Sequence, residues 1–251
     1  MNQPAALLLL KMNSPTGNSG EWNHWFDDIH AKEWMSCPGI KAIRRFELTP
    51  GMPEGWDVPA PTHLIVYELN SLDVITSKEY AALVKTVPLC PPEMSKLESS
   101  DTLNLTGGVF QQIIPDSEVY EIPAEASYLL AVGHAGIPIE VEEEYHAWYN
   151  TEHIPAYLEI PGFLSARRFR RIVQHTPVSG LNVIGADYIA LYDLSNNRVF
   201  DSAEFKVRGV TPWSTRIRSY TWQRRQMTNI YKSMLKAVED ENNGKDMYAG
   251  K

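Results

Sequence analysis

Short apolar runs alternate with amphipathic stretches along the chain, and the same order of elements occurs twice. Residues 5–12 and 127–133 are apolar enough to form buried strands. Each run is followed by a helical pattern, over residues 20–35 and 139–158, that leads into a Pro-Gly pair, a strong helix stop. Each half therefore begins with a strand and then a helix.

The rest of each half predicts two strands, a second helix and a final strand. These cover residues 40–48, 62–69, 77–85 and 103–114 in the first half, and 163–172, 183–194, 198–208 and 215–225 in the second. The order β-α-β-β-α-β is that of a ferredoxin-like unit, whose sheet carries helices on one face only. The bare face needs a cover, which a second unit supplies. We therefore predict an α+β fold in which two tandem antiparallel sheets pack face to face as a pseudo-twofold barrel.

The two halves also repeat in sequence. Residues 22–46 and 145–169 align without gaps at an offset of 123, with seven identities in 25 positions, among them Trp25/Trp148 and His30/His153. The match resumes at an offset of 125, where Tyr67-Glu68-Leu69 meets Tyr192-Asp193-Leu194. Chance would rarely align Trp and His in this way, so the pattern predicts a tandem duplication.

The repeat sets the predicted domain boundaries. Residues 1–114 form the first unit, 115–126 a polar linker, and 127–226 the second unit. Residues 227–251 are expected to be an amphipathic C-terminal helix, to about residue 239, and a polar disordered tail.

Composition narrows the class of protein. The chain has 251 residues, 43% of them apolar, and a net charge of −8 with no basic run, which argues against nucleic-acid or anionic-membrane partners. Cys37 and Cys90 match no metal-ligand or disulfide framework. The apolar run near the N-terminus is too short for a signal peptide or a membrane span, so a cytoplasmic location is the default expectation.

A histidine lies at the same position of each predicted first helix. Helical spacings of three and four residues place aromatic neighbours on the same stripe. That stripe holds Trp25, Phe26, His30 and Trp34 in the first half and Tyr145, Trp148, Tyr149, Glu152, His153 and Tyr157 in the second. A histidine among such rings is most often a hydrogen-bonded core residue, but rings of this kind also line ligand pockets.

Three features favour a functional histidine. It is kept in both halves while most neighbours differ, it is ringed by Trp and Tyr, and Pro155 follows His153 by two residues. The proline should kink the helix and put His153 near a helix C-terminus, which favours a protonated ring able to donate a proton. We therefore expect His153 or His30 to be catalytic, with Tyr149 and Glu152 orienting it.

Arg44 and Arg167 occupy matching positions on predicted strands, on the same face as apolar residues. A buried guanidinium needs an anionic partner, either a protein carboxylate or a substrate carboxylate or phenolate. No metal-site motif is complete, and no Gly-rich phosphate loop, GxSxG or HExxH sequence occurs. We therefore expect neither a metal nor a cofactor.

The second half resembles a known family. Residues 144–155 (EYHAWYNTEHIP), the Ile160-Pro161-Gly162-Phe163 segment and the Arg-rich strand at 166–169 resemble the EthD-like branch of the dimeric α+β barrel superfamily. With the first copy, the resemblance covers most of residues 1–226. The first copy departs from the pattern, because Lys32 replaces the proline and Phe26 the tyrosine, which favours the second copy as the working one.

The resemblance implies several functions. Many relatives are small cofactor-free enzymes that act on aromatic or polyketide-like compounds, others bind haem, and the family's motif histidine matches His153 and His30. Our leading expectation is a cofactor-independent lyase or isomerase (cyclase, decarboxylase, dehydratase or lactone isomerase) that uses acid/base chemistry. Its substrate would be bound by Trp25, Phe26, Trp34, Tyr145, Trp148, Tyr157, Arg44 and Arg167.

The alternatives are a haem protein or cofactor-free monooxygenase, and a non-catalytic binding or assembly protein. A homodimer of the fused pair is a further expectation.

Overall fold

The first half of the chain forms four strands, with its helices between them. The computed structural model describes residues 4–13, 19–87, 104–115, 120–173, 182–208, 210–220, 224–234 and 238–239. The elements of the first half are β1 (Ala6–Met12), α1 (Ser19–His24), η1 (Trp25–His30), α2 (Ala31–Met35), β2 (Ile40–Thr49), β3 (His63–Leu69), α3 (Asp73–Thr76), α4 (Lys78–Thr86) and β4 (Thr106–Ile114).

The second half repeats this order, and its described residues also include the short strand β7 and the helix α10. Its elements are β5 (Tyr128–Ala135), α7 (Ile139–Trp148), η2 (Tyr149–His153), α8 (Ile154–Leu158), β6 (Phe163–Arg171), β7 (Asn182–Val183), β8 (Tyr188–Leu194), η3 (Val199–Asp201), α9 (Ala203–Arg208), α10 (Pro212–Ser219) and β9 (Arg224–Ser233). A short strand, β10 (Val238–Glu239), pairs with β2.

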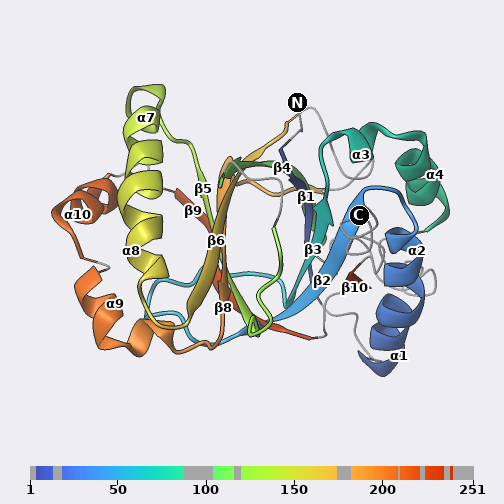
Figure 1. Ribbon diagram of the computed structural model, residues 1–251, viewed down its shortest axis with the longest axis horizontal. Coiled ribbons are helices and arrows are strands. Elements are labelled where there is room, and N and C mark those ends of the chain that lie inside the picture. Colours follow the sequence, from blue (N-terminus) through green and yellow to red (C-terminus); the bar gives the residue numbers. More distant parts are fainter. Residues whose placement is uncertain are drawn as a thin grey trace, which may run out of the picture.

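Eight antiparallel strands close into a barrel. The order β4-β1-β3-β2 of the first half matches β9-β5-β8-β6 of the second, and the barrel closes where β2 pairs with β9 and β4 pairs with β6. Figure 1 shows the strands in the centre, with helices α1 to α4 on one side and α7 to α10 on the other. The predicted α+β barrel is confirmed.

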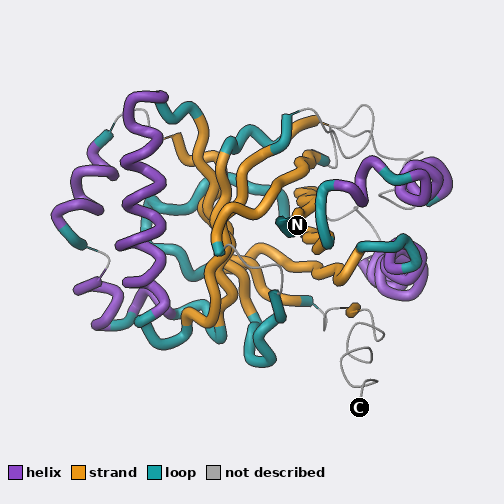
Figure 2. The backbone as a smooth tube through the Cα atoms, turned by 45° about the horizontal axis from the view of Figure 1, so that its top comes forward, coloured by secondary structure: helices purple, strands orange, loops and turns teal. Residues whose placement is uncertain are grey.

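The alternation of side chains along the strands creates three apolar cores. Leu7, Leu9, Phe46, Phe110 and Phe169 belong to the core inside the barrel. The opposite faces of the same strands pack under the helices of each half and form two outer cores. Figure 2 shows the resulting layers, helices outside the strands on both sides. A site between a helix and the sheet therefore belongs to one half, outside the barrel.

Two predicted C-terminal elements are wrong. Residues 212–219 form α10 instead of a strand, because Thr211 caps the helix by accepting a hydrogen bond from Ser214 N and Pro212 occupies its first turn. Residues 227–233 belong to strand β9 (Arg224–Ser233) instead of a helix. Met227, Ile230 and Tyr231 are buried between β2 and β5, since closure of the barrel requires an eighth strand there.

Some expectations fall on residues that the structure does not describe. Cys90, the tail at 240–251 and linker residues 116–119 lie outside the described ranges. Within those ranges, no helix is both long and apolar enough to cross a membrane.

Candidate functional site

Both histidines lie at the end of a π-helical turn within the first helix of their half. In the second half α7 runs into η2, which ends at His153, and α8 continues to Leu158. In the first half η1 ends at His30 in the same way. Lys32 stands there where the second half has Pro155, so the wide turn does not depend on the proline. Such turns are rare and frequently occur at functional sites.

His30 is built into the core of the first half. Its Nε2 and the Tyr67 hydroxyl share a hydrogen bond of 2.7 Å, and the side chain is fully buried. The rings of Trp25, Phe26 and Trp34 lie 4.8, 5.0 and 5.3 Å from the imidazole, between ring centroids. This packing is the structural role that the sequence left open for a ringed histidine.

His153 borders a cavity of about 50 Å³ between the helix and the sheet of the second half. The indole of Trp148 stacks on its imidazole at 4.3 Å, and the Tyr157 ring lies at 4.1 Å. No described residue hydrogen-bonds to its ring nitrogens. Trp148, Tyr149, His153 and Tyr157, four of the residues expected at the site, line this cavity together.

Tyr192 lines the same cavity from β8 and corresponds in the repeat to Tyr67, the partner of His30. Its hydroxyl is buried and has no hydrogen-bond partner among the described residues. Burial of such a donor without a partner costs about 1–3 kcal/mol. In the first half, His30 and Tyr67 are hydrogen-bonded to each other. In the second half, the matching His153 and Tyr192 share no described hydrogen bond, and both border the cavity.

The cavity is completed by residues that the sequence analysis missed. His134 comes from β5, Arg218 from α10 and Arg225 from β9, while Met52 and Trp56 reach over from the β2–β3 loop of the first half. Strand periodicity could have indicated His134. The other residues lie on a loop and on elements predicted wrongly.

Burial favours the neutral forms of the two histidines and of Tyr192 at the cavity. Desolvation, followed by the charge of Arg218 and then by His134 and Arg168, holds the pKa of His153 well below its usual value. Desolvation and Arg225 lower the pKa of His134 to about 3. Burial also raises the pKa of Tyr192 well above 10, so its hydroxyl stays protonated. This direction is opposite to the expected protonated imidazole, because burial favours the neutral ring of His153.

Glu152 and Tyr145 lie beside the cavity and do not line it. Glu152 Oε1 accepts hydrogen bonds from Thr211 Oγ1 at 2.5 Å and from Ser214 Oγ at 3.3 Å, so this carboxylate holds α10. The Tyr145 hydroxyl and His134 Nδ1 share a hydrogen bond of 3.1 Å. Neither residue reaches His153 directly.

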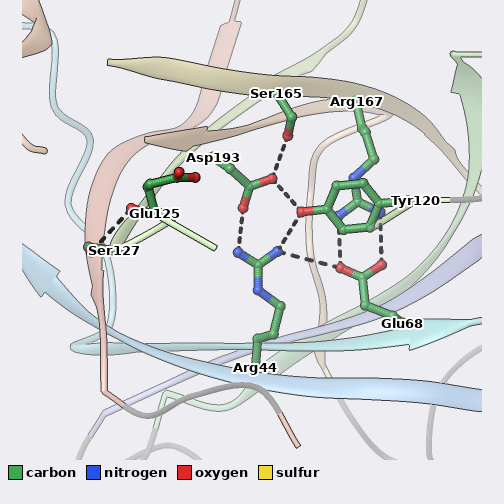
Figure 3. Close-up of polar contacts among 8 residues, drawn as sticks. All are labelled: Arg44, Glu68, Tyr120, Glu125, Ser127, Ser165, Arg167 and Asp193. Atoms are coloured by element: carbon green, nitrogen blue, oxygen red, sulfur yellow. Dashed lines mark hydrogen bonds and ion pairs between the residues drawn. The ribbon is translucent and has the colours of Figure 1, made fainter. Parts of the chain in front are cut away.

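Arg44 and Arg167 lie inside the barrel, away from both histidines. Arg167 donates to the two oxygens of Glu68 at 2.8 and 2.7 Å, and Arg44 donates to Asp193. The Tyr120 hydroxyl donates to Asp193, and its ring lies 3.3 Å from the Arg167 guanidinium carbon (Figure 3). Protein carboxylates are thus the partners of both arginines, which was one of the two sequence-based expectations.

The surroundings of His30 do not fit a haem ligand, because its Nε2 is hydrogen-bonded to Tyr67 inside a packed core. Among the described residues there is also no cluster of three or more His, Cys, Asp or Glu side chains able to hold a metal ion.

Comparison with known proteins reveals similarity of structure only. No protein-family model matches the chain, and no curated protein matches it in sequence. An anthrone oxidase-like protein superposes with a TM-score of 0.56 and 13% identity, over 95% of this chain and 94% of that one.

Two further solved structures are similar. A candidate monooxygenase of Fusobacterium nucleatum has a TM-score of 0.54 and 10% identity over 96% of both chains. A chlorite dismutase of Candidatus Nitrospira defluvii, crystallised with cyanide, has a TM-score of 0.50 and 11% identity over 94% of this chain and 92% of its own. These likenesses identify the fold as a dimeric α+β barrel, and at such identities they establish the fold alone.

Proposed function

We propose that the protein is a cofactor-independent enzyme in which neutral His153 removes a proton from a flat, oxygenated aromatic compound. The observation that carries this proposal is the open His153–Tyr192 pair. A proton acceptor and a proton donor border one cavity, and neither has a described hydrogen-bond partner. A substrate with an acidic hydrogen next to a carbonyl or phenol satisfies both groups.

The proposed step is a single proton transfer. A ring nitrogen of His153 takes the substrate proton, the bonding electron pair moves onto the conjugated substrate oxygen, and the imidazole becomes positively charged. The Tyr192 hydroxyl then donates a hydrogen bond to that oxyanion, and Arg218 lies close enough to the cavity to stabilise its charge. Trp148 and Tyr157 supply flat apolar walls.

The lowered pKa of His153 suits this order of events. An imidazole that is neutral in the empty site is available as a base throughout the neutral pH range. Once an oxyanion forms in the cavity, its negative charge favours the protonated imidazole and raises the pKa of His153 toward its usual value. The charge on the base and the charge on the substrate thus develop together.

Return of the proton to another atom gives an isomerisation, and departure of a group from the anion gives an elimination or decarboxylation. We therefore keep lyase or isomerase chemistry as the first proposal. The test measures the proton transfer itself: exchange of the methylene hydrogens of anthrone for deuterium in D₂O without oxygen, followed by NMR.

His153→Gln should slow this exchange about 10²- to 10⁴-fold, the range for loss of a general base. His30→Gln is the matched control and should leave the exchange rate within about twofold, while it lowers thermal stability because the Tyr67 bond is lost. Equal exchange rates for the wild type and a folded His153→Gln variant would contradict the proposal.

A cofactor-free monooxygenase is the second candidate, because an anthrone oxidase-like protein and a candidate monooxygenase share the fold. The first step would be the same. The substrate carbanion would then react with O₂, so that a methylene group plus O₂ yields a carbonyl group plus water. An oxygen electrode separates the two candidates, since only the oxygenase consumes one O₂ for each anthrone converted.

We also propose that the halves arose by tandem duplication and that the second half is EthD-like. The matching strand orders and the aligned π turns at His30 and His153 support this origin. The first copy would then have kept the fold and closed its pocket. In a purely structural or assembly protein, by contrast, both histidines would affect stability alone.

A further inference from the structure

Arg45 and Arg168 are matching residues of the repeat, and each is buried under the first helix of its half. The guanidinium carbon of Arg168 lies 4.2 Å from the ring centroid of Tyr149 and 5.2 Å from that of Tyr145. That of Arg45 lies at similar distances, 4.6 and 4.9 Å, from the rings at the matching positions of the first half. The two arginines therefore occupy the same place in their halves.

The hydrogen-bond partners of the two arginines differ in charge. Arg45 Nη2 forms an ion pair with Asp27 Oδ2 at 3.2 Å. At the position of Asp27 the second half has Asn150, whose Oδ1 accepts a hydrogen bond from Arg168 Nη1 at 2.6 Å. Arg168 Nη2 donates to His146 Nδ1 at 3.0 Å, and this nitrogen must carry a lone pair because a guanidinium only donates. Among the described residues, no Asp or Glu forms an ion pair with Arg168.

The charge of Arg168 is therefore buried and hydrogen-bonded but not neutralised. Its side chain is 1% exposed, and buried charges are normally paired. Arg44 and Arg167, inside the barrel, both have carboxylates as partners. Desolvation and then the charge of Arg168 lower the pKa of His146, against a smaller rise from Glu142, so this partner favours its neutral form. The unneutralised charge is the first of two observations.

The second observation is that this charge acts on groups around the cavity. Tyr149, which packs against the Arg168 guanidinium, lines the cavity. Burial raises the pKa of Tyr149, and the charge of Arg168 opposes that rise. Desolvation lowers the pKa of His153 most, and the charges of Arg218 and Arg168 add to that effect. The charge of Arg168 thus favours a negative oxygen and a neutral imidazole in the cavity.

We infer that Arg168 is a positioning residue of the proposed enzyme, whose unneutralised charge acts across the Tyr149 ring and stabilises the oxyanion that forms beside His153. This inference rests on the proposed function and adds a source of charge behind the wall of the cavity. A charge that is held in place before the reaction needs no reorganisation when the oxyanion forms. In the first half the matching charge is paired with Asp27, and His30 there is part of a packed core.

Asn150→Asp tests the inference, because it gives Arg168 the carboxylate that its counterpart already has. The first half accommodates this arrangement, so the variant should fold. Desolvation raises the pKa of Asp27, so exchange of the anthrone protons is measured at about pH 8, where the introduced carboxylate is ionised. The exchange should slow about tenfold, the factor that corresponds to one pKa unit.

Two control variants change charge without changing Arg168. Thr151→Asp adds the same charge at an exposed position of the same helix, and Asp27→Asn removes the ion pair of the first half. Both should keep the exchange rate within about twofold of the wild type. Arg168→Gln should slow the exchange as Asn150→Asp does, whereas Arg168→Lys should recover most of the rate because the charge is kept. A wild-type rate in Asn150→Asp, shown to be folded by circular dichroism, overturns the inference.

The pH profile of kcat/KM provides a readout that a merely structural role would not change. Neutral His153 is the proposed base, so activity falls as the pH drops below its pKa. Pairing of Arg168 raises that pKa, and the acid limb should therefore move to higher pH in Asn150→Asp but not in Thr151→Asp. The other ionisable groups around His153 are kept in both variants: Arg218, Arg225, His134, Glu152 and the three tyrosines of the lining. An acid limb at the wild-type pH in Asn150→Asp would contradict the inference.

The two proposals fail in different ways. If Asn150→Asp slows the exchange but His153→Gln does not, the charge of Arg168 stands and the catalytic base does not. If His153→Gln abolishes exchange but Asn150→Asp keeps the wild-type rate and acid limb, the base stands and the role of Arg168 does not.

Discussion

Tyr67 and Tyr192 occupy matching positions of the repeat, and each lies under a helix that carries a histidine. The Tyr67 hydroxyl is bonded to His30, whereas the Tyr192 hydroxyl is buried without a described partner. Tyr67 is therefore a structural partner of His30, whereas Tyr192 and His153 both face the cavity and are available to a ligand.

Replacing these tyrosines by phenylalanine should separate the roles. Tyr192→Phe should lower kcat for anthrone proton exchange about 10²-fold with little change in KM, because the hydroxyl bonds the oxyanion more strongly than the ground state. It should not destabilise the fold, since the lost hydroxyl has no partner to leave behind.

Tyr67→Phe is the matched control. It should leave kcat unchanged and lower the free energy of unfolding by about 1–3 kcal/mol, because His30 loses its buried partner. The reverse outcome, a stability loss only in Tyr192→Phe, would mean that the two residues have been assigned the wrong roles.

Helix α10 is the element that positions Arg218 at the cavity. Thr211 caps its N-terminus and also donates to Glu152, and Ser214 in its first turn accepts a hydrogen bond from Trp148 Nε1 at 3.1 Å. These bonds tie α10 to η2 and α7, the same helix that carries His153. Glu152, expected from sequence to orient the histidine, thus acts through α10.

Thr211→Ala should lower the free energy of unfolding by about 1–2 kcal/mol, the usual loss for a helix N-cap. It should also slow anthrone proton exchange several-fold, because Arg218 is held less firmly at the cavity, while Thr211→Ser keeps both properties. Chemical denaturation and the NMR exchange assay provide the two measurements. A destabilised variant with an unchanged exchange rate would show that α10 is stable in position without its cap.

At the scale of the whole molecule, charged groups cross the barrel from one half to the other. Arg44 of the first half bonds Asp193 of the second, and Arg167 of the second bonds Glu68 of the first. Burial alone would raise the pKa of Asp193, but Arg44 and Arg167, with hydrogen bonds from Ser165 and Tyr120, bring it below its usual value. Tyr120, between the halves in sequence, thereby fixes the connecting segment to the barrel.

Glu68→Gln should lower the free energy of unfolding by about 3–5 kcal/mol, because two buried guanidiniums would then share one carboxylate. Asp201→Asn, which removes an exposed ion pair with Arg198, is the control and should have almost no effect on the melting temperature. The two halves should still unfold in one transition in both variants. A Glu68→Gln protein as stable as the wild type would mean that the barrel tolerates an unpaired buried charge.

The sequence alone determined the features that depend on local periodicity and on the repeat. Apolar alternation, Pro-Gly stops and the matched segments predicted the βαββαβ order, the closed α+β barrel and the stripe of rings beside both histidines. The helix predicted from residue 227 was wrong: residues 227–231 of β9 are buried on both faces, so their sequence shows no strand alternation. α10 was missed although Thr211-Pro212 is a recognisable helix start.

Tertiary structure decided which residues line the cavity beside His153. The loop with Trp56 comes from the other half, and Arg218, Arg225 and Tyr192 come from three different elements, so no local pattern contains the site. The protonation state of His153 was likewise invisible in sequence, because desolvation depends on what surrounds the ring in space. Local order is encoded by neighbours along the chain, whereas a pocket is made by residues that meet only after folding.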